Sequence, residues 1–153
     1  NSLGDRSGVS EFLKKVCKLD TTGKLYSLVW DTFSGNIRIF LNNKFTFQPF
    51  WDEQNNSETK KDWQAGFYNE NKRAFKAIAE QNTSTILNIL FKRLYTLRNQ
   101  IIHGGASFNS SVNTAQKKEA CIFLLNILPA IIKIIMDNHK EDWGKPYYPV
   151  IKE

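Results

Sequence analysis

The sequence predicts an all-α fold, a bundle of about five helices. Apolar residues recur at helical spacing, as in Leu87, Leu90, Leu94, Leu97 and Ile101. Residues that commonly cap helices precede several of these runs, for example Ser10 and Asn82. The chain is also 41% hydrophobic and 13% aromatic over 153 residues, which predicts one packed domain and argues against disorder.

Five helices are expected from these patterns. They cover residues 10–19, about 20–42 with a break at Ser34-Gly35, 61–81, about 83–102, and 113–138. Residues 1–9 are expected to be disordered or derived from a tag, so that residues 10–153 form the single domain. No secretory signal appears at the start of the sequence.

Residues 43–60 are expected to form an aromatic-rich loop. Pro49 and the polar run 52–59 favour a loop, although the alternation of Phe45 and Phe47 also permits a short strand. The aromatic residues here could cover one end of the bundle, belong to a dimer surface, or stack on nucleic-acid bases. From Trp143 onward, the proline-aromatic run 145–149 predicts an extended C-terminal tail packed on the bundle.

Composition narrows the classes of function. The formal charge of +6 favours approach to polyanions without establishing binding. No Cys/His cluster has zinc spacing, so neither a metal nor a cofactor is expected. Cys17 and Cys121 are interpreted as buried free thiols of a cytoplasmic protein, although a disulfide stays open. The apolar run 120–136 contains Asn126, Pro129 and Lys133, which favours a core helix over a membrane span.

The strongest chemical signal is the string Arg98-Asn99-Gln100-Ile101-Ile102-His103-Gly104-Gly105. An apolar helix leads into it, and Gly104 is a natural helix stop. Asn99 and His103 are four residues apart and share a helix face, while the long Arg98 side chain can swing toward the imidazole. These groups could hold a phosphate and transfer a proton near neutral pH.

This string resembles the Arg-x4-His motif of the HEPN superfamily, the higher eukaryotes and prokaryotes nucleotide-binding domains. The flanking segments 43–51 and 141–149 also resemble bacterial Apea-like HEPN proteins, which extends the resemblance over most of residues 10–150. It implies a helical bundle, a homodimer in which two motifs face each other, and metal-independent RNA cleavage in toxin or defence systems. Arg98 would stabilise the scissile phosphate, His103 would transfer protons, and Asn99 would orient the phosphate or the arginine.

One position departs from the family pattern. HEPN proteins that pair with a nucleotidyltransferase often carry a tyrosine two residues after the histidine, where this chain has Gly105. A toxin neutralised by modification of that tyrosine is therefore disfavoured, while a nuclease without such a partner stays open.

Two weaker sets of residues could contact a substrate. Lys72, Arg73 and Lys76 form either a solvated helix face or an RNA track. Asn109, Ser110 and Asn113 precede the last helix, whose positive N-terminus could attract phosphate, although capping of the loop is the favoured explanation.

The sequence thus leaves three functions open. The first is an RNA-cleaving enzyme, and the second is a non-catalytic module that binds a nucleotide, RNA or a protein partner. The third is a structural helical dimer in which Arg98 and His103 only cap a helix. No membrane is expected among the partners.

Overall fold

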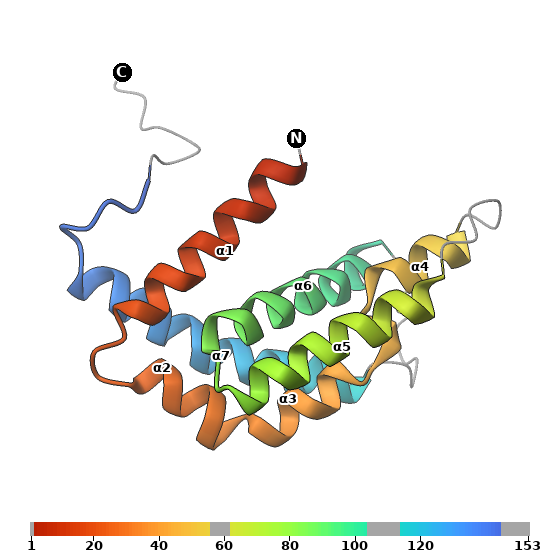
Figure 1. Ribbon diagram of the computed structural model, residues 1–153, viewed down its shortest axis with the longest axis horizontal. Helices are drawn as coiled ribbons and strands as arrows, with labels where there is room; N and C mark the ends of the chain where they lie inside the picture. The colour runs from red at the N-terminus through yellow and green to blue at the C-terminus, as the bar shows by residue number, and fades with distance from the viewer. Residues whose placement is uncertain (1, 56–61, 104–113, 145–153) are drawn as a thin grey trace.

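The computed structural model describes residues 2–55, 62–103 and 114–144, and the side chains of the first range from residue 8 onward. Every regular element in these ranges is helical, so the predicted all-α class is confirmed (Figure 1). The elements are α1 (Ser2–Lys18), α2 (Lys24–Ser27), a π-helical turn (Leu28–Thr32), α3 (Ser34–Leu41), a 3-10 turn (Lys44–Thr46), α4 (Gln48–Asn55), α5 (Trp63–Ala79), α6 (Thr83–Ile102) and α7 (Thr114–Asp137).

The expected count of about five helices is wrong, because the described residues contain seven α-helices. The predicted helix over residues 20–42 is divided into α2, the π-helical turn and α3. Phe33 leaves helical geometry (φ −108°, ψ 6°) and its side chain is buried, so core packing holds the chain in this break. The sequence does place the break correctly, since α3 begins at Ser34.

The loop expected over residues 43–60 is also wrong, because α4 occupies much of it. Pro49 lies in the first turn of α4, where a proline needs no amide partner and its fixed φ suits a helix. Ahead of it, the Asn43 side chain accepts a hydrogen bond from the Phe45 amide at 2.9 Å and starts the 3-10 turn. A single proline therefore marked the beginning of a helix rather than a loop.

The aromatic side chains of this segment pack on one another and on α5. The Phe50 ring lies 5.1 Å from that of Trp63, in an edge-to-face contact. Trp51 Nε1 donates a hydrogen bond to the Phe45 carbonyl at 2.8 Å, and Gln100 Nε2 of α6 donates to the same oxygen. Of the three roles expected for these aromatics, covering the protein's own core is the one that these contacts support.

The N-terminus also differs from expectation. Residues 1–9 were expected to lie outside the fold, but α1 begins at Ser2 and not at Ser10. Each residue added to an existing helix gains one backbone hydrogen bond, so a helix anchored by the buried Leu13 and Val16 can extend beyond its apolar pattern. In Figure 1 the N-terminal half of α1 projects away from the other helices.

The helices predicted over residues 61–81, 83–102 and 113–138 are confirmed as α5, α6 and α7. The Asp62 side chain caps α5 by accepting from the Ala65 amide at 3.0 Å. Asn82 caps α6 in the same way, accepting from the Thr85 amide at 3.1 Å. The predicted C-terminal tail falls in 145–153, outside the described residues; Trp143, just before it, packs against Phe12 with ring centroids 6.0 Å apart.

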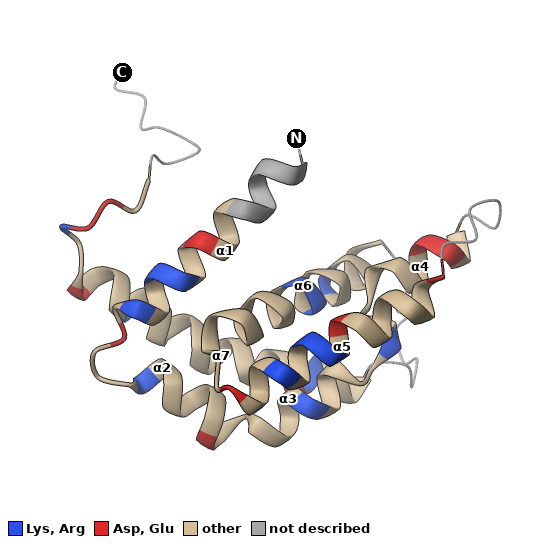
Figure 2. Ribbon diagram, viewed as in Figure 1, with Lys and Arg blue, Asp and Glu red and all other residues tan. Residues whose placement is uncertain are grey.

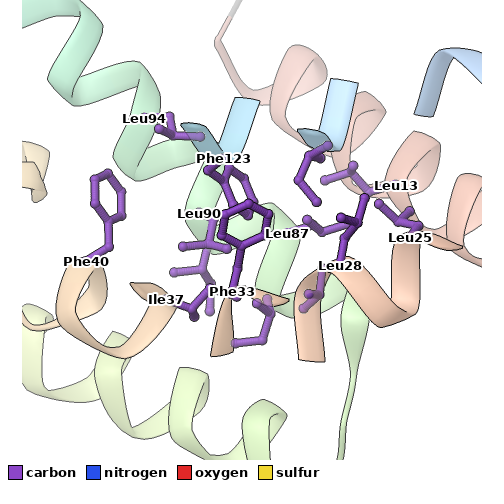
Figure 3. Packing of buried hydrophobic residues seen from close by; sticks show 14 of the residues in the cluster. Leu13, Leu25, Leu28, Phe33, Ile37, Phe40, Leu87, Leu90, Leu94 and Phe123 are labelled. Carbon is purple, nitrogen blue, oxygen red and sulfur yellow. The ribbon is translucent and has the colours of Figure 1, made fainter. Parts of the chain in front are cut away.

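The core lies between α6 and the elements around it, which include α1, α3 and α5. Figure 3 shows Leu87 and Leu90 among the rings of Phe33 and Phe123, whose centroids are 5.4 Å apart. All four of these residues are buried. Packing against the core therefore determines which residues of α6 are buried, and the other residues of this helix face outward.

Candidate functional site

The outward side of α6 carries the motif residues. Arg98 and His103 are exposed and Asn99 is partly buried. Leu94, Leu97 and Gln100, on the other side of the helix, are buried against the core. The separation by polarity is incomplete, because the polar Gln100 is buried while the apolar Ile101 and Ile102 of the motif are exposed.

The motif residues also contact each other. Arg98 Nη1 donates a hydrogen bond to the Asn99 side-chain oxygen at 3.2 Å. The His103 amide donates to the Asn99 carbonyl at 2.9 Å, so His103 is the C-cap residue of α6. Its side chain is exposed, and the imidazole makes no hydrogen bond or ion pair with any residue that the structure describes.

Two residues that the sequence analysis did not assign to the site share this outward side. Tyr95 is 64% exposed and lies three residues before Arg98 and four before Asn99. Lys92, three residues before Tyr95, is also exposed. An exposed aromatic ring between two cations is a feature of surfaces that bind single-stranded nucleic acid. The spacing of Lys92, Tyr95 and Arg98 was the signal in the sequence that could have identified them.

Arg93, five residues before Arg98, is a further missed residue, and its side chain is 1% exposed. The guanidinium carbon lies 4.7 Å from the ring centroid of Phe47 and 4.9 Å from that of Phe67. Nε is 3.0 Å from Glu70 Oε1, and Nη2 donates to Asn71 Oδ1 at 3.3 Å. This arginine holds α5, α6 and the aromatic segment together.

The hydrogen bonds of Arg93 are incomplete. Its Nε–H is close to Glu70 but not aligned with a carboxylate oxygen, so the contact is an ion pair, and Nη1 has no described acceptor. Burial lowers the pKa of Arg93 from its ordinary value, and the Glu70 carboxylate opposes that shift. Arginine nevertheless stays protonated in proteins, so the fold contains a permanent positive charge in its interior.

The first set of weaker substrate-binding candidates lies on the surface of α5. Lys72, Arg73 and Lys76 are exposed on α5 (Figure 2), and Lys76 Nζ lies 3.7 Å from Glu80 Oε1. Within the part of the chain that the structure describes, no hydrogen bond or ion pair joins them to Arg98, Asn99 or His103. They form a solvated face that the structure does not connect to the motif.

The remaining candidates, Asn109, Ser110 and Asn113, lie outside the described residues. Among the described residues there is no group of three or more histidine, cysteine or acidic side chains that could hold a metal ion. The candidate functional site therefore consists of Arg98, Asn99 and His103.

The two cavities described in the structure lie away from this site. One is lined mostly by apolar residues, among them Phe40, Leu94 and Phe123. The other is lined by residues that include Cys17, Asp20 and Tyr26. Burial raises the pKa of the Cys17 thiol to about 11, with a smaller contribution from the Asp20 carboxylate, so this thiol is protonated at neutral pH and is a poor nucleophile.

Comparisons with known proteins give no independent assignment. No family model matches the chain, and neither a curated protein nor a solved structure matches it.

Proposed function

We propose that this chain is a HEPN-type protein that binds RNA on the outward side of α6 and cleaves it without a metal ion. The observation that supports this proposal best is the joint exposure of Arg98 and His103 on α6, next to Asn99. A purely structural pair at a helix end would instead be expected to contact carboxylates or to be buried. Neither Arg98 nor His103 forms an ion pair with any described residue.

Each residue has a role in this proposal. In the cleavage step the ribose 2′-OH loses its proton and attacks the adjacent phosphorus. The P–O5′ bond breaks, and the departing 5′ oxygen gains a proton, which leaves a 2′,3′-cyclic phosphate. His103 carries one of these protons, and Arg98 stabilises the negative charge of the transition state. Asn99, through its hydrogen bond from Arg98 Nη1, orients the guanidinium toward the phosphate.

Nearby residues provide the binding surface. Tyr95 offers an exposed ring for stacking, and Lys92 adds a second cation on the same side of the helix. The excess of 21 Lys and Arg over 15 Asp and Glu assists the approach of RNA. The proposal also keeps the family arrangement, in which a homodimer brings two motifs together.

The test is RNA cleavage in the presence of EDTA, with wild type compared to His103→Ala. Wild type is expected to leave 2′,3′-cyclic phosphate and 5′-hydroxyl ends, and His103→Ala to reduce the rate at least about 100-fold, the range for losing a general acid or base. His139→Ala is the matched control, because His139 is the other histidine of the chain and is also exposed. Equal cleavage by all three proteins would mean that a contaminant is responsible.

The second candidate is a module that binds RNA or a nucleotide without cleaving it. The series Lys92, Tyr95 and Arg98 favours it, since three exposed residues at helical spacing form a binding surface that requires no proton transfer. Fluorescence anisotropy with a labelled oligonucleotide separates the two functions. For a binding module, wild type and His103→Ala are expected to bind the oligonucleotide equally well, and neither protein is expected to cleave RNA.

A further inference from the structure

Gln100 is the buried residue of the motif string. Among residues 98–103, Gln100 is 7% exposed, Asn99 is partly buried, and the other four are exposed. The roles of Arg98, Asn99 and His103 in the proposed cleavage leave the Gln100 side chain without a part in the chemistry. A buried amide costs free energy unless it is hydrogen-bonded, so the hydrogen bond that Gln100 makes indicates what this residue does.

The Gln100 side chain reaches the 3-10 turn, 55 residues earlier in the chain. Its Nε2 donates a hydrogen bond to the Phe45 carbonyl. Trp51 Nε1 donates to the same oxygen at 2.8 Å, so this carbonyl accepts two side-chain donors. A carbonyl oxygen has two lone pairs, and the two donors together satisfy both of them.

The acceptor is itself held in place by its surroundings. The Phe45 amide donates to Asn43 Oδ1 at 2.9 Å, and the fully buried Thr46 donates through Oγ1 to the Asn43 carbonyl at 2.8 Å. The Phe45 ring packs edge to face on Phe50, with centroids 5.4 Å apart. Phe50 in turn packs on Trp63 of α5. The Phe45 carbonyl is therefore a fixed point to which α6 is attached.

Helix α6 meets the aromatic segment at two levels. Arg93 contacts it near the middle of the helix, through the Phe47 ring. Gln100 contacts it in the last turn, through the Phe45 carbonyl. Arg93 and Gln100 are seven residues apart, about two helical turns, and so lie on the same side of α6. Arg98, two residues before Gln100, leaves the helix on nearly the opposite side, so the side chain that anchors the last turn is separate from those that would contact RNA.

The last turn of α6 needs such an anchor. The ends of helices fray, because their final carbonyls have no partner within the helix. His103 is the C-cap, and its amide donates to the Asn99 carbonyl at 2.9 Å. Without the Gln100 bond, no buried side chain of residues 98–103 would hold this turn against the rest of the described fold.

We propose that Gln100 is a positioning residue for RNA cleavage. Its hydrogen bond to the Phe45 carbonyl fixes the last turn of α6. The fixed turn then holds Arg98 and His103 in one arrangement around a phosphate. This role rests on the proposed function, because two groups that act on one phosphate must keep their relative positions. A displacement of about 1 Å can lower a catalytic rate about 100-fold.

The test compares two substitutions that each remove one donor from the Phe45 carbonyl. Gln100→Met keeps an unbranched side chain of similar length, and Trp51→Phe keeps an aromatic ring. In each variant the carbonyl still accepts from the remaining donor, so this buried oxygen is not left unpaired and both proteins are expected to fold. Only Gln100→Met releases the last turn of α6, so Trp51→Phe is the matched control. Gln100→Leu is the second variant without the donor, should methionine perturb the packing.

The first measurement is the amide hydrogen exchange of His103, followed by NMR, and it does not depend on activity. The His103 amide bonds the Asn99 carbonyl across the last turn, so its exchange reports the fraying of that turn. Gln100→Met is expected to accelerate this exchange at least about 5-fold, with a smaller change at the amides in the middle of α6. Trp51→Phe is expected to leave it within about 2-fold of wild type. Equal exchange in wild type and Gln100→Met would overturn the proposal.

The second measurement is the steady-state kinetics of RNA cleavage in EDTA, at a temperature where circular dichroism shows all the proteins to be folded. Gln100→Met is expected to lower kcat at least about 10-fold and to leave KM within about 3-fold, because Lys92 and Tyr95 lie outside the last turn and still bind RNA. Trp51→Phe is expected to retain the kcat of wild type.

The two measurements separate failure of the positioning role from failure of the proposed function. If wild type cleaves RNA and Gln100→Met has the same kcat, the positioning role is wrong even where the His103 amide exchanges faster. If wild type cleaves no RNA, the proposed function is wrong and Gln100 positions no catalytic group; the exchange of the His103 amide then decides only whether Gln100 anchors the end of α6.

Discussion

Arg93 and Arg98 are two arginines of the same helix, five residues apart, with opposite surroundings. Arg93 is 1% exposed, lies between two phenylalanine rings and is paired with Glu70. Arg98 is exposed, and its described contact is a hydrogen bond to its neighbour Asn99. Five residues turn a helix by about 140°, so the two side chains leave α6 on different sides.

The side of α6 on which an arginine lies therefore determines whether its charge is buried within the fold or accessible to an anion. On the inner side the charge is desolvated and needs Glu70 and the aromatic rings to compensate. On the outer side the charge is hydrated, contributes little to stability and is accessible to an anion. Substitutions on the inner side of α6 are therefore expected to change the unfolding free energy far more than substitutions on the outer side.

The largest effect is expected from Glu70→Ala. The substitution leaves the Arg93 charge buried without its carboxylate partner, and breaking such a pair costs about 3 kcal/mol of unfolding free energy. Urea unfolding followed by circular dichroism measures this change. Glu80→Ala, which removes the exposed partner of Lys76, is the control and should change stability by less than about 0.5 kcal/mol.

A smaller effect is expected from Arg93→Met. Methionine preserves much of the volume between the rings of Phe47 and Phe67 and removes the charge, while Glu70, 20% exposed, can turn to water. The same unfolding measurement should show a loss of about 1 kcal/mol. A loss as large as that of Glu70→Ala would mean that ring packing, and not charge compensation, dominates at this position.

The two cysteines give a further contrast between buried and exposed groups. The folded-state pKa of Cys17 is raised from 9.0 to about 11, so the folded protein retains this proton more strongly than the unfolded chain. The stabilisation of the folded protein by the protonated Cys17 thiol is therefore complete below pH 9 and is lost as the pH rises through about 11. The melting temperature of wild type should fall over this window more steeply than that of Cys17→Ala.

Alkylation provides the companion measurement. Iodoacetamide at pH 8 should modify the exposed Cys121 well before the partly buried Cys17, as peptide mass spectrometry would show. Faster modification of Cys17 would contradict the burial described here.

The smallest effect on stability is expected from Arg98→Ala. The side chain is exposed and has no described ion pair, so the unfolding free energy should change by less than about 0.5 kcal/mol. Differential scanning calorimetry is sensitive enough to detect a larger loss. Such a loss would mean that Arg98 stabilises the fold, as Arg93 does.

Apolar periodicity and caps predicted the long helices well. The start of α6 follows from the Asn82 cap, and apolar spacing located α5 and α7, both of which are local signals. The π-helical turn and α4 could not be predicted in the same way. Both make contacts with residues distant in the sequence, such as the hydrogen bond from Trp30 of the π-helical turn to Thr83 and the ring contact of Phe50 of α4 with Trp63.

The same distinction applies to the site. Helical spacing was enough to predict that Arg98, Asn99 and His103 lie at the end of α6, because the six residues from Arg98 to His103 continue one helix to its C-cap. It also puts Arg93 and Arg98 on different sides of α6, but it could not show that Glu70 and the rings of Phe47 and Phe67 enclose Arg93, since burial depends on what packs against each side of the helix. The exposure of Tyr95 was missed for the same reason.

The central claim is that the outer side of α6, and not its inner side, acts on RNA. The most direct test is the initial rate of RNA cleavage in EDTA by Arg98→Ala and Arg93→Met, at a temperature where both are folded. The account predicts that Arg98→Ala loses cleavage by at least about 100-fold while Arg93→Met stays within about 3-fold of wild type. Full activity of Arg98→Ala would contradict it.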